Sequence, residues 1–225
     1  MDLDFNPPPP LRLSTGHGAL DLVLGGGWPI GRLCEVVGPA GAGKRTLGLA
    51  AVASAQREGK TVAWVDGSHD LDPAVAIRLG VDLGRMLVSQ PDTLEQGLDI
   101  VESLARSGAV DLLVVKDLAS LEAPGDHPSI GTVPRLFSKS LRRLTTRPAT
   151  VLFLSTLHAR PSYSWHDGVR EDTRCGNALK YFSSVRLDVR RWRTDDTDTR
   201  VRVIKNKFAP PFQTVNLCLN PLPSE

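Results

Sequence analysis

The sequence has few cysteines, few aromatic residues, little net charge and no long hydrophobic run. Its three cysteines, Cys34, Cys175 and Cys218, are far apart and form no C-x-x-C pair or Cys/His cluster, which argues against a zinc module. The 27 basic and 25 acidic residues leave a formal charge of +2, which by itself predicts no nucleic-acid partner. No apolar run approaches the ~18 residues of a membrane-spanning helix, and Asp2 and Asp4 replace a basic leader. We therefore expect no membrane association, no resident metal, and a cytoplasmic protein.

What is present favours one globular domain. Hydrophobic residues make up 41% of the 225 residues, and a chain of this size buries roughly 70% of its unfolded surface. The run Pro7 to Pro10 predicts an extended N-terminal arm over residues 1–13. We expect a core domain over 14–219 and a flexible Pro-rich tail over 220–225.

Apolar strands alternate with helical segments through most of the chain. Strands are predicted at 33–37, 61–66, 86–89, 112–115 and 150–155, and helices at 45–58, 73–79, 94–107 and 133–146. Such alternation is typical of an α/β fold with a mainly parallel sheet and helices on both faces. Alternating valines and charged residues near 185–189 and 201–203 add a C-terminal β-hairpin, and a last strand follows at 214–219.

A glycine-rich loop joins the first of these strands to the first long helix. It reads Gly38-Pro39-Ala40-Gly41-Ala42-Gly43-Lys44. Backbone N–H groups and a lysine in this context wrap phosphates, so Gly38, Gly41, Gly43 and Lys44 predict a P-loop that holds ATP or another anion.

Two positions beside this loop depart from the usual pattern. The residue after the lysine, which normally holds Mg²⁺ through a hydroxyl, is Arg45, and Thr46 should point elsewhere because it lies ~100° further round the helix. Lys116 ends the strand that usually supplies a metal-organising acid, and strand alternation turns Asp117 away. We expect Arg45 and Lys116 to repel Mg²⁺ and to neutralise a phosphate or pair with Asp66 or Asp117. The alternative is that Arg45 turns away and Thr46 shifts inward to hold the metal.

Many short motifs resemble the core of bacterial RecA recombinase in order and spacing. They are Ser14-Thr15-Gly16, Leu20-Asp21, Gly31-Arg32, the phosphate loop, 55–61, Leu71-Asp72-Pro73, 106–111, 176–180, 185–188 and Lys205-Asn206-Lys207. The resemblance covers about 14–219. It implies the RecA-like P-loop ATPase core.

The resemblance also implies roles that this chain has changed. RecA-like enzymes have a water-activating glutamate where Ser68 stands, an adenine-stacking tyrosine at Val75 and a γ-phosphate-sensing glutamine at Thr156. From these changes we expect that hydrolysis is lost and that the chain is not an enzyme. Lys205 and Lys207, which reach a neighbour's nucleotide in that family, persist as partner-facing residues. The family's N-terminal helix and C-terminal domain are not in this sequence, so a monomer is expected.

The opening segments 14–21 and 25–29 are similar to those of ImuA proteins, which are RecA-like factors of the SOS response. This resemblance implies a non-catalytic accessory role in translesion mutagenesis and DNA repair, beside RecA, an ImuB-like protein and a replicative-type polymerase at the nucleoid. The alternative is a residual DNA-stimulated ATPase of homologous recombination, with Thr46, Asp66 and Asp117 as replacement metal ligands.

Two loops correspond to those that grip single-stranded DNA in RecA, at about 122–132 and 158–176. The first has no Lys or Arg. The second offers cations for phosphates and rings for base stacking, namely Arg160, Tyr163, Trp165, Arg170 and Arg174. We expect weak, salt-sensitive DNA binding; the alternative is a surface loop without that role.

Overall fold

The computed structural model describes residues 10–121, 132–144, 148–160, 170–191 and 198–219. Within these ranges no helix is long and apolar enough to cross a membrane. The predicted tail, and residues 1–9 of the predicted arm, lie outside the described residues.

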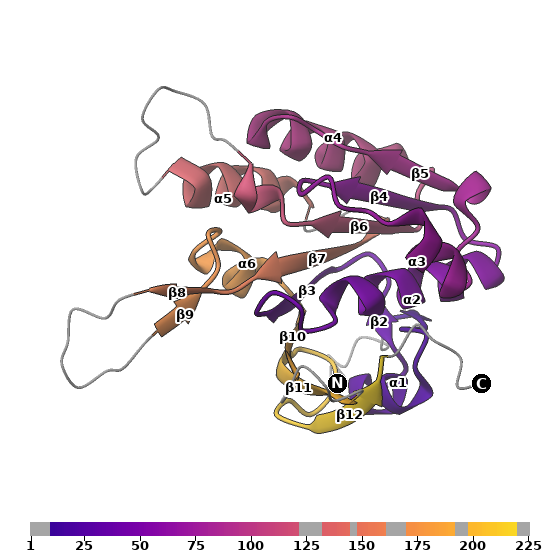
Figure 1. Ribbon diagram of the computed structural model, residues 1–225. Helices are drawn as coiled ribbons and strands as arrows, with labels where there is room; N and C mark the ends of the chain where they lie inside the picture. Colours follow the sequence, from indigo (N-terminus) through magenta and orange to yellow (C-terminus); the bar gives the residue numbers. More distant parts are fainter. Residues whose placement is uncertain (1–9, 122–131, 145–147, 161–169, 192–197, 220–225) are drawn as a thin grey trace, which may run out of the picture.

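An eight-stranded sheet forms the centre of the molecule, in the order β12-β11-β10-β3-β7-β6-β4-β5 (Figure 1). The strands from β10 to β5 are parallel, and β11 and β12 continue the sheet antiparallel at one edge. The strands are β3 (Leu33–Gly38), β4 (Val62–Asp66), β5 (Met86–Ser89), β6 (Leu112–Lys116), β7 (Thr150–Thr156), β10 (Val185–Arg191), β11 (Asp198–Asn206) and β12 (Thr214–Cys218). The predicted α/β fold and C-terminal hairpin are confirmed.

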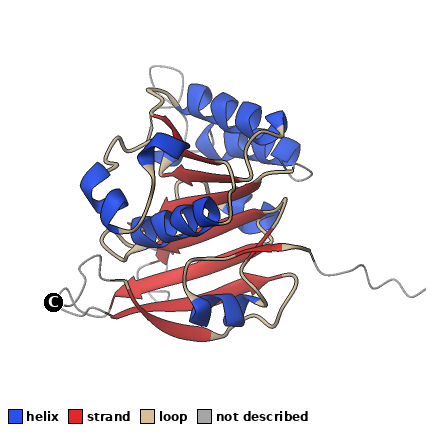
Figure 2. Ribbon diagram, turned by 90° about the vertical axis from the view of Figure 1, so that its right-hand side faces the viewer, coloured by secondary structure: helices blue, strands red, loops and turns tan. Residues whose placement is uncertain are grey.

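Helices cover both faces of this sheet, as Figures 1 and 2 show. One face carries α1 (Gly18–Leu24), α2 (Lys44–Arg57) and α3 (Pro73–Arg78), and the other carries α4 (Leu94–Ser107), α5 (Thr132–Leu144) and α6 (Asn177–Phe182). The central strands are apolar throughout because side chains alternate between two buried faces. In β4, Val62 and Trp64 pack with the α2 side, and Ala63 and Val65 pack with the α4 side.

Several short elements were not predicted. β1 (Arg12–Leu13) pairs antiparallel with β2 (Trp28–Pro29), so the end of the predicted arm is a strand, and Leu13 is buried. β8 (His158–Arg160) pairs with β9 (Arg170–Asp172), which gives the long polar segment a hairpin base. The helices α1 and α6 and the 3-10 turns η1 (Leu83–Arg85) and η2 (Leu118–Ser120) were also missed.

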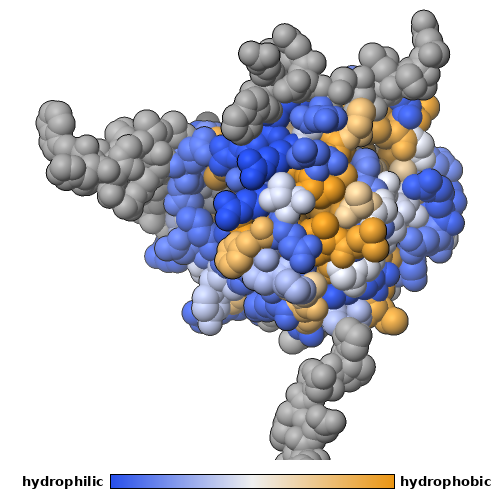
Figure 3. All heavy atoms as spheres, turned by 90° about the horizontal axis from the view of Figure 1, so that it is seen from below, coloured by the Kyte–Doolittle hydropathy of each residue, from blue (hydrophilic) through white to orange (hydrophobic). Residues whose placement is uncertain are grey.

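The antiparallel edge has a charged outer surface. In β11, Arg200 and Arg202 are exposed, whereas Val201 and Val203 are buried, as the alternation predicted. Figure 3, seen from below the view of Figure 1, shows hydrophilic atoms beside a hydrophobic region on this side of the molecule. Leu22 of α1 is one of the exposed apolar residues of the molecule.

Candidate nucleotide site

The glycine-rich loop connects β3 to α2 at the carboxyl end of the parallel strands. Gly41 and Gly43 have positive φ angles of 75° and 94°, a region that residues with a Cβ rarely adopt. A Cβ at Gly38 would lie 2.3 Å from the Val189 carbonyl oxygen of β10, so close packing of the strands requires glycine there. The loop therefore has the turn and the helix start that the sequence predicted.

A pocket of about 400 Å³ opens at this loop. The residues that line it include Gly41, Gly43, Lys44, Arg45, Thr46, Asp70, Val75, Lys116, Asp117 and Thr156. The structure thus brings together the loop, both added cations and two of the altered positions. Thr46, predicted to point elsewhere, is among the lining residues.

Lys44 lies almost wholly buried at the base of the pocket. Its Nζ donates to the carbonyl oxygens of Gly38 at 2.8 Å and Pro39 at 2.7 Å. Burial lowers the pKa of Lys44; the carboxylate of Asp117 opposes this shift and the charge of Lys116 reinforces it. The loop's own carbonyls hold the ammonium group where an anion would meet it.

Arg45 turns along the pocket rim toward the segment after β4. Its guanidinium donates to the Asp70 carbonyl oxygen at 2.8 Å and lies 3.6 Å from the Asp70 carboxylate. Position 45 thus contributes a second cation to the pocket and no hydroxyl ligand.

Lys116 stands at the centre of a group of three carboxylates. Its Nζ lies 2.7 Å from Asp70, 3.5 Å from Asp117 and 4.0 Å from Asp66, and its side chain is 9% exposed. It also donates to the Ser68 hydroxyl, which lies within hydrogen-bond distance of both Asp66 and Asp70. The predicted pairing of Lys116 with Asp66 or Asp117 occurs, and Asp70 is a closer partner than either.

Asp66 is fully buried and saturated with hydrogen bonds. Its carboxylate accepts from the backbone N–H groups of Ser68 at 3.2 Å, Asp70 at 2.9 Å and Leu71 at 2.9 Å. Partial burial alone would raise the pKa of Asp70, but the hydrogen bond and charge of Lys116 lower it. The lowered pKa favours the ionised form of Asp70 beside Lys116, and backbone hydrogen bonds fix the position of Asp66.

Asp117 follows β6 in a left-handed backbone conformation, with φ 46° and ψ 32°. This conformation ends strand alternation, so the prediction that Asp117 turns away is wrong. Its Oδ1 accepts from the Thr156 backbone N–H at 2.9 Å, and the residue lines the pocket. No local pattern predicts this turn, because it depends on contacts with Leu154 and Thr156 of β7.

These residues do not fit a magnesium ion. Within the described part of the chain, no group of three or more His, Cys, Asp or Glu side chains is arranged to hold a metal. The three carboxylates near the pocket surround an ammonium group instead, and position 45 has no hydroxyl. A divalent ion would have to displace Lys116 to reach them.

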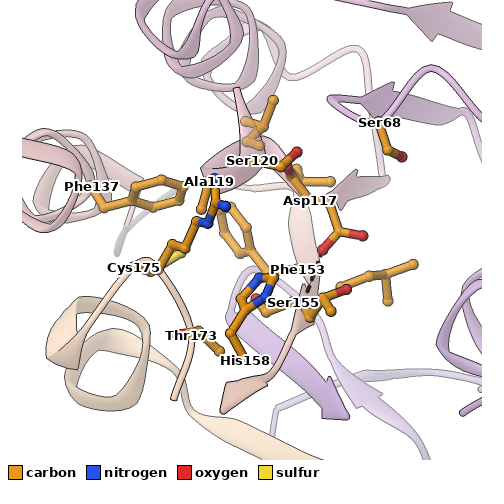
Figure 4. A pocket seen from close by; sticks show the side chains of 15 residues that line it. Ser68, Asp117, Ala119, Ser120, Phe137, Phe153, Ser155, His158, Thr173 and Cys175 are labelled. Carbon is orange, nitrogen blue, oxygen red and sulfur yellow. Dashed lines mark hydrogen bonds between the residues drawn. The ribbon is translucent and has the colours of Figure 1, made fainter. Parts of the chain in front are cut away.

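A second cavity of about 180 Å³ lies beside the pocket (Figure 4). Phe137, Phe153 and Leu118 give it an apolar lining, and Asp117 and Thr156 form a wall shared with the nucleotide pocket. Figure 4 shows Asp117 on the side of Ser68, with Phe137 and Cys175 at the other end. A movement of Asp117 or Thr156 would change the shape of both cavities.

The two partner-facing lysines lie elsewhere, at the end of β11. Lys205 Nζ donates to the carbonyl oxygens of Lys180 at 2.8 Å and Tyr181 at 3.0 Å, so it caps the C-terminus of α6. Burial lowers the pKa of Lys205, and the charge of Lys207 adds to this effect. Their role toward a neighbour's nucleotide stays a prediction.

The predicted DNA-binding residues are only partly described. Arg160 of β8 and Arg170 of β9 are paired positions in the backbone register, and Arg174 is exposed at the second cavity. Tyr163 and Trp165 lie outside the described residues, as does most of the 122–132 loop.

Comparisons with known proteins decide the family. The sequence model described as the RecA N-terminal domain matches residues 11–220. The chain belongs to the RecA family. It is 47% identical to Protein RecA of Prochlorococcus marinus (strain NATL1A) over 89% of the chain, and 46% identical to that of Gluconacetobacter polyoxogenes over 90%. It spans 57% and 63% of the lengths of these two relatives.

The RecA-like fold has a solved counterpart. The crystal structure of the RadB recombinase matches with a TM-score of 0.72 at 21% identity, over 93% of this chain and 97% of the other. This likeness shows the same fold.

Membership of the RecA family corrects one prediction. The relatives named RecA, which are 46–47% identical to this chain, are ATPases, and this contradicts the prediction that the chain is not an enzyme. The prediction relied on a few altered side chains, whereas the chain as a whole is 47% identical to a RecA protein. The altered side chains change the charges in the pocket, but the glycine-rich loop still leads into α2 at Lys44, whose Nζ contacts the loop carbonyls.

Proposed function

We propose that the chain is the ATP-binding and ATP-hydrolysing core of a RecA-family protein that acts on DNA in recombination and repair. The observation that carries this proposal is the position of Lys44, buried at the base of a 400 Å³ pocket and hydrogen-bonded to two loop carbonyls. A phosphate entering the pocket meets this ammonium group and the N-terminus of a 14-residue helix, both of which favour anions.

DNA is the proposed macromolecular partner, and the cytoplasm the proposed location. Exposed basic residues support this: Arg200 and Arg202 on β11, and Arg174 beside the second cavity. Such residues bind phosphates in a salt-dependent manner. Weak binding that falls steeply between low and high salt is expected.

ATP binding and turnover test the proposal together. The wild-type protein should bind a fluorescent ATP analogue and release phosphate faster when single-stranded DNA is added. Lys44→Ala should reduce both by at least about tenfold, because a buried charge-assisted contact to phosphate is lost. Lys60→Ala is the matched control, since Lys60 is a surface lysine paired with Asp111 at 3.7 Å. Equal binding by the wild type and Lys44→Ala would contradict the proposal.

A finer candidate is an ImuA-type accessory role in the SOS response and translesion synthesis. Ser68 and Val75 favour it, because the RecA resemblance implies a glutamate and a tyrosine at these positions. Val75 lines the pocket, and the Ser68 hydroxyl donates to Asp70 of the pocket lining. In this role the chain would contact RecA, an ImuB-like protein and a replicative-type polymerase. Binding titrations of the purified chain with each partner test it. Binding to none of them, alongside normal strand exchange by the chain itself, would favour a recombinase.

A further inference from the structure

We infer that the Lys116 ammonium group takes the place of the divalent cation in this pocket, so that ATP binds without Mg²⁺. This inference rests on the proposed binding of ATP and specifies how its phosphate charge is neutralised. It concerns residues in which this chain differs from the RecA pattern.

The position of Lys116 is the first support. Its side chain comes from the carboxyl end of β6, lines the pocket, and is only 9% exposed. Asp70, Asp117 and Asp66 hold its Nζ within 2.7 to 4.0 Å, so the positive charge is fixed in advance rather than recruited from solution. A fixed charge of this kind acts as a metal ion does, as a preorganised partner for phosphate oxygens.

The state of the carboxylates is the second support. Asp66 is buried and accepts three backbone hydrogen bonds, and Asp117 accepts one from Thr156 while facing Lys116. Lys116 fills the space between these carboxylates, so a metal ion would have to displace its ammonium group to bind them. The neighbouring charges of Lys44 and Arg45 further oppose a divalent cation.

Removal of the Lys116 side chain should change how ATP binding depends on Mg²⁺. Without this side chain, the carboxylates of Asp70 and Asp117 face the pocket with no cation between them. They should then repel the phosphates of free ATP and attract Mg²⁺. Lys116→Met should therefore convert a metal-independent site into a metal-dependent one.

Equilibrium binding of ATP, with EDTA or with excess Mg²⁺, tests this for the wild type, Lys116→Met and the surface control Lys60→Met. The wild type and Lys60→Met should bind with Kd values that differ by less than about twofold between the two conditions. Lys116→Met should bind about tenfold more weakly in EDTA and regain affinity with Mg²⁺, because one charge-assisted contact is lost and a metal can replace it. Circular dichroism and the melting temperature identify variants that fail to fold, and Lys116→Gln replaces Lys116→Met in that case.

Each other outcome has a separate meaning. Wild-type binding only with Mg²⁺ would overturn the inference and leave the proposed function intact. Equal binding in EDTA by Lys116→Met and the wild type would overturn the role of Lys116. No binding of ATP by the wild type under either condition would overturn the proposed function as well.

Discussion

Two basic side chains on the same sheet have carboxylate partners but different surroundings. They are Lys116 of β6, which is buried, and Arg186 of β10, which is partly buried. Arg186 pairs with Glu35 of β3 through Nε at 2.5 Å, and the two residues are directly opposite in the parallel ladder. Glu35 is fully buried, and neither residue lines the nucleotide pocket. Lys116, by contrast, lies at the strand end and opens onto the pocket.

Burial of an ion pair therefore does not by itself reveal the role of the pair. The Glu35–Arg186 pair joins neighbouring strands 151 residues apart in sequence, so its function is structural. Burial raises the pKa of Glu35, and the charge of Arg186 opposes that shift. The Lys116 group has one open side, where a phosphate can replace a carboxylate as partner. Position at the strand end, rather than burial, separates the two groups.

The largest expected effect is on stability, at the structural pair. Glu35→Ala leaves Arg186 without its partner and should lower the free energy of unfolding by about 3–5 kcal/mol. Lys116→Met should cost only about 1–2 kcal/mol, because Asp66 keeps its backbone hydrogen bonds and the other carboxylates reach water. Urea unfolding measures both. A larger loss of unfolding free energy for Lys116→Met than for Glu35→Ala would contradict this ranking.

A second contrast lies within the phosphate loop. Gly38→Ala should destabilise the protein by about 2–3 kcal/mol or more, because the new Cβ would lie 2.3 Å from the Val189 oxygen and separate β3 from β10. Gly41→Ala has open space and should cost about 1–2 kcal/mol through its positive φ alone. Thermal unfolding gives the ranking, and the reverse order would show that backbone strain outweighs strand packing.

A smaller loss of folding stability is expected at low pH. The pKa of Asp70 is below its ordinary value of 3.8. Its pairing with Lys116 therefore contributes stability above that value, and the contribution is lost as the pH falls through the lower folded-state pKa. Urea midpoints between pH 6 and pH 3 should fall more steeply for the wild type than for Lys116→Met. Parallel profiles would show that Asp70 is not coupled to Lys116.

The smallest change in stability is expected for a substitution at Cys218, which thiol labelling distinguishes from the other two cysteines. Cys218 is exposed and should react rapidly with a thiol reagent at pH 8. Burial raises the pKa of both Cys34 and Cys175, so these thiols should react only after unfolding. Cys218→Ser should remove the rapid phase without changing the melting temperature. A rapid reaction of Cys175 would show that the second cavity opens to solvent.

The alternating strands and helices, the phosphate loop and the cation at position 116 could all be predicted from the sequence. These features depend on local periodicity and on residue types at fixed spacing, which are read directly along the chain. The sequence also predicted that Lys116 would pair with an acid of the pocket. The observed pairs with Asp66 and Asp117 agree with that expectation.

Only the tertiary structure decided which groups meet. Asp70 reaches Lys116 from a loop 46 positions earlier, and Asp117 enters the pocket because a left-handed turn ends β6. Arg186 finds Glu35 through parallel pairing of two distant strands. Short elements such as α6 and the β8–β9 pair have too few residues to be stable alone, so their formation depends on packing and pairing with other parts of the chain. Contacts of this kind depend on the whole folded chain, and no local pattern in the sequence encodes them.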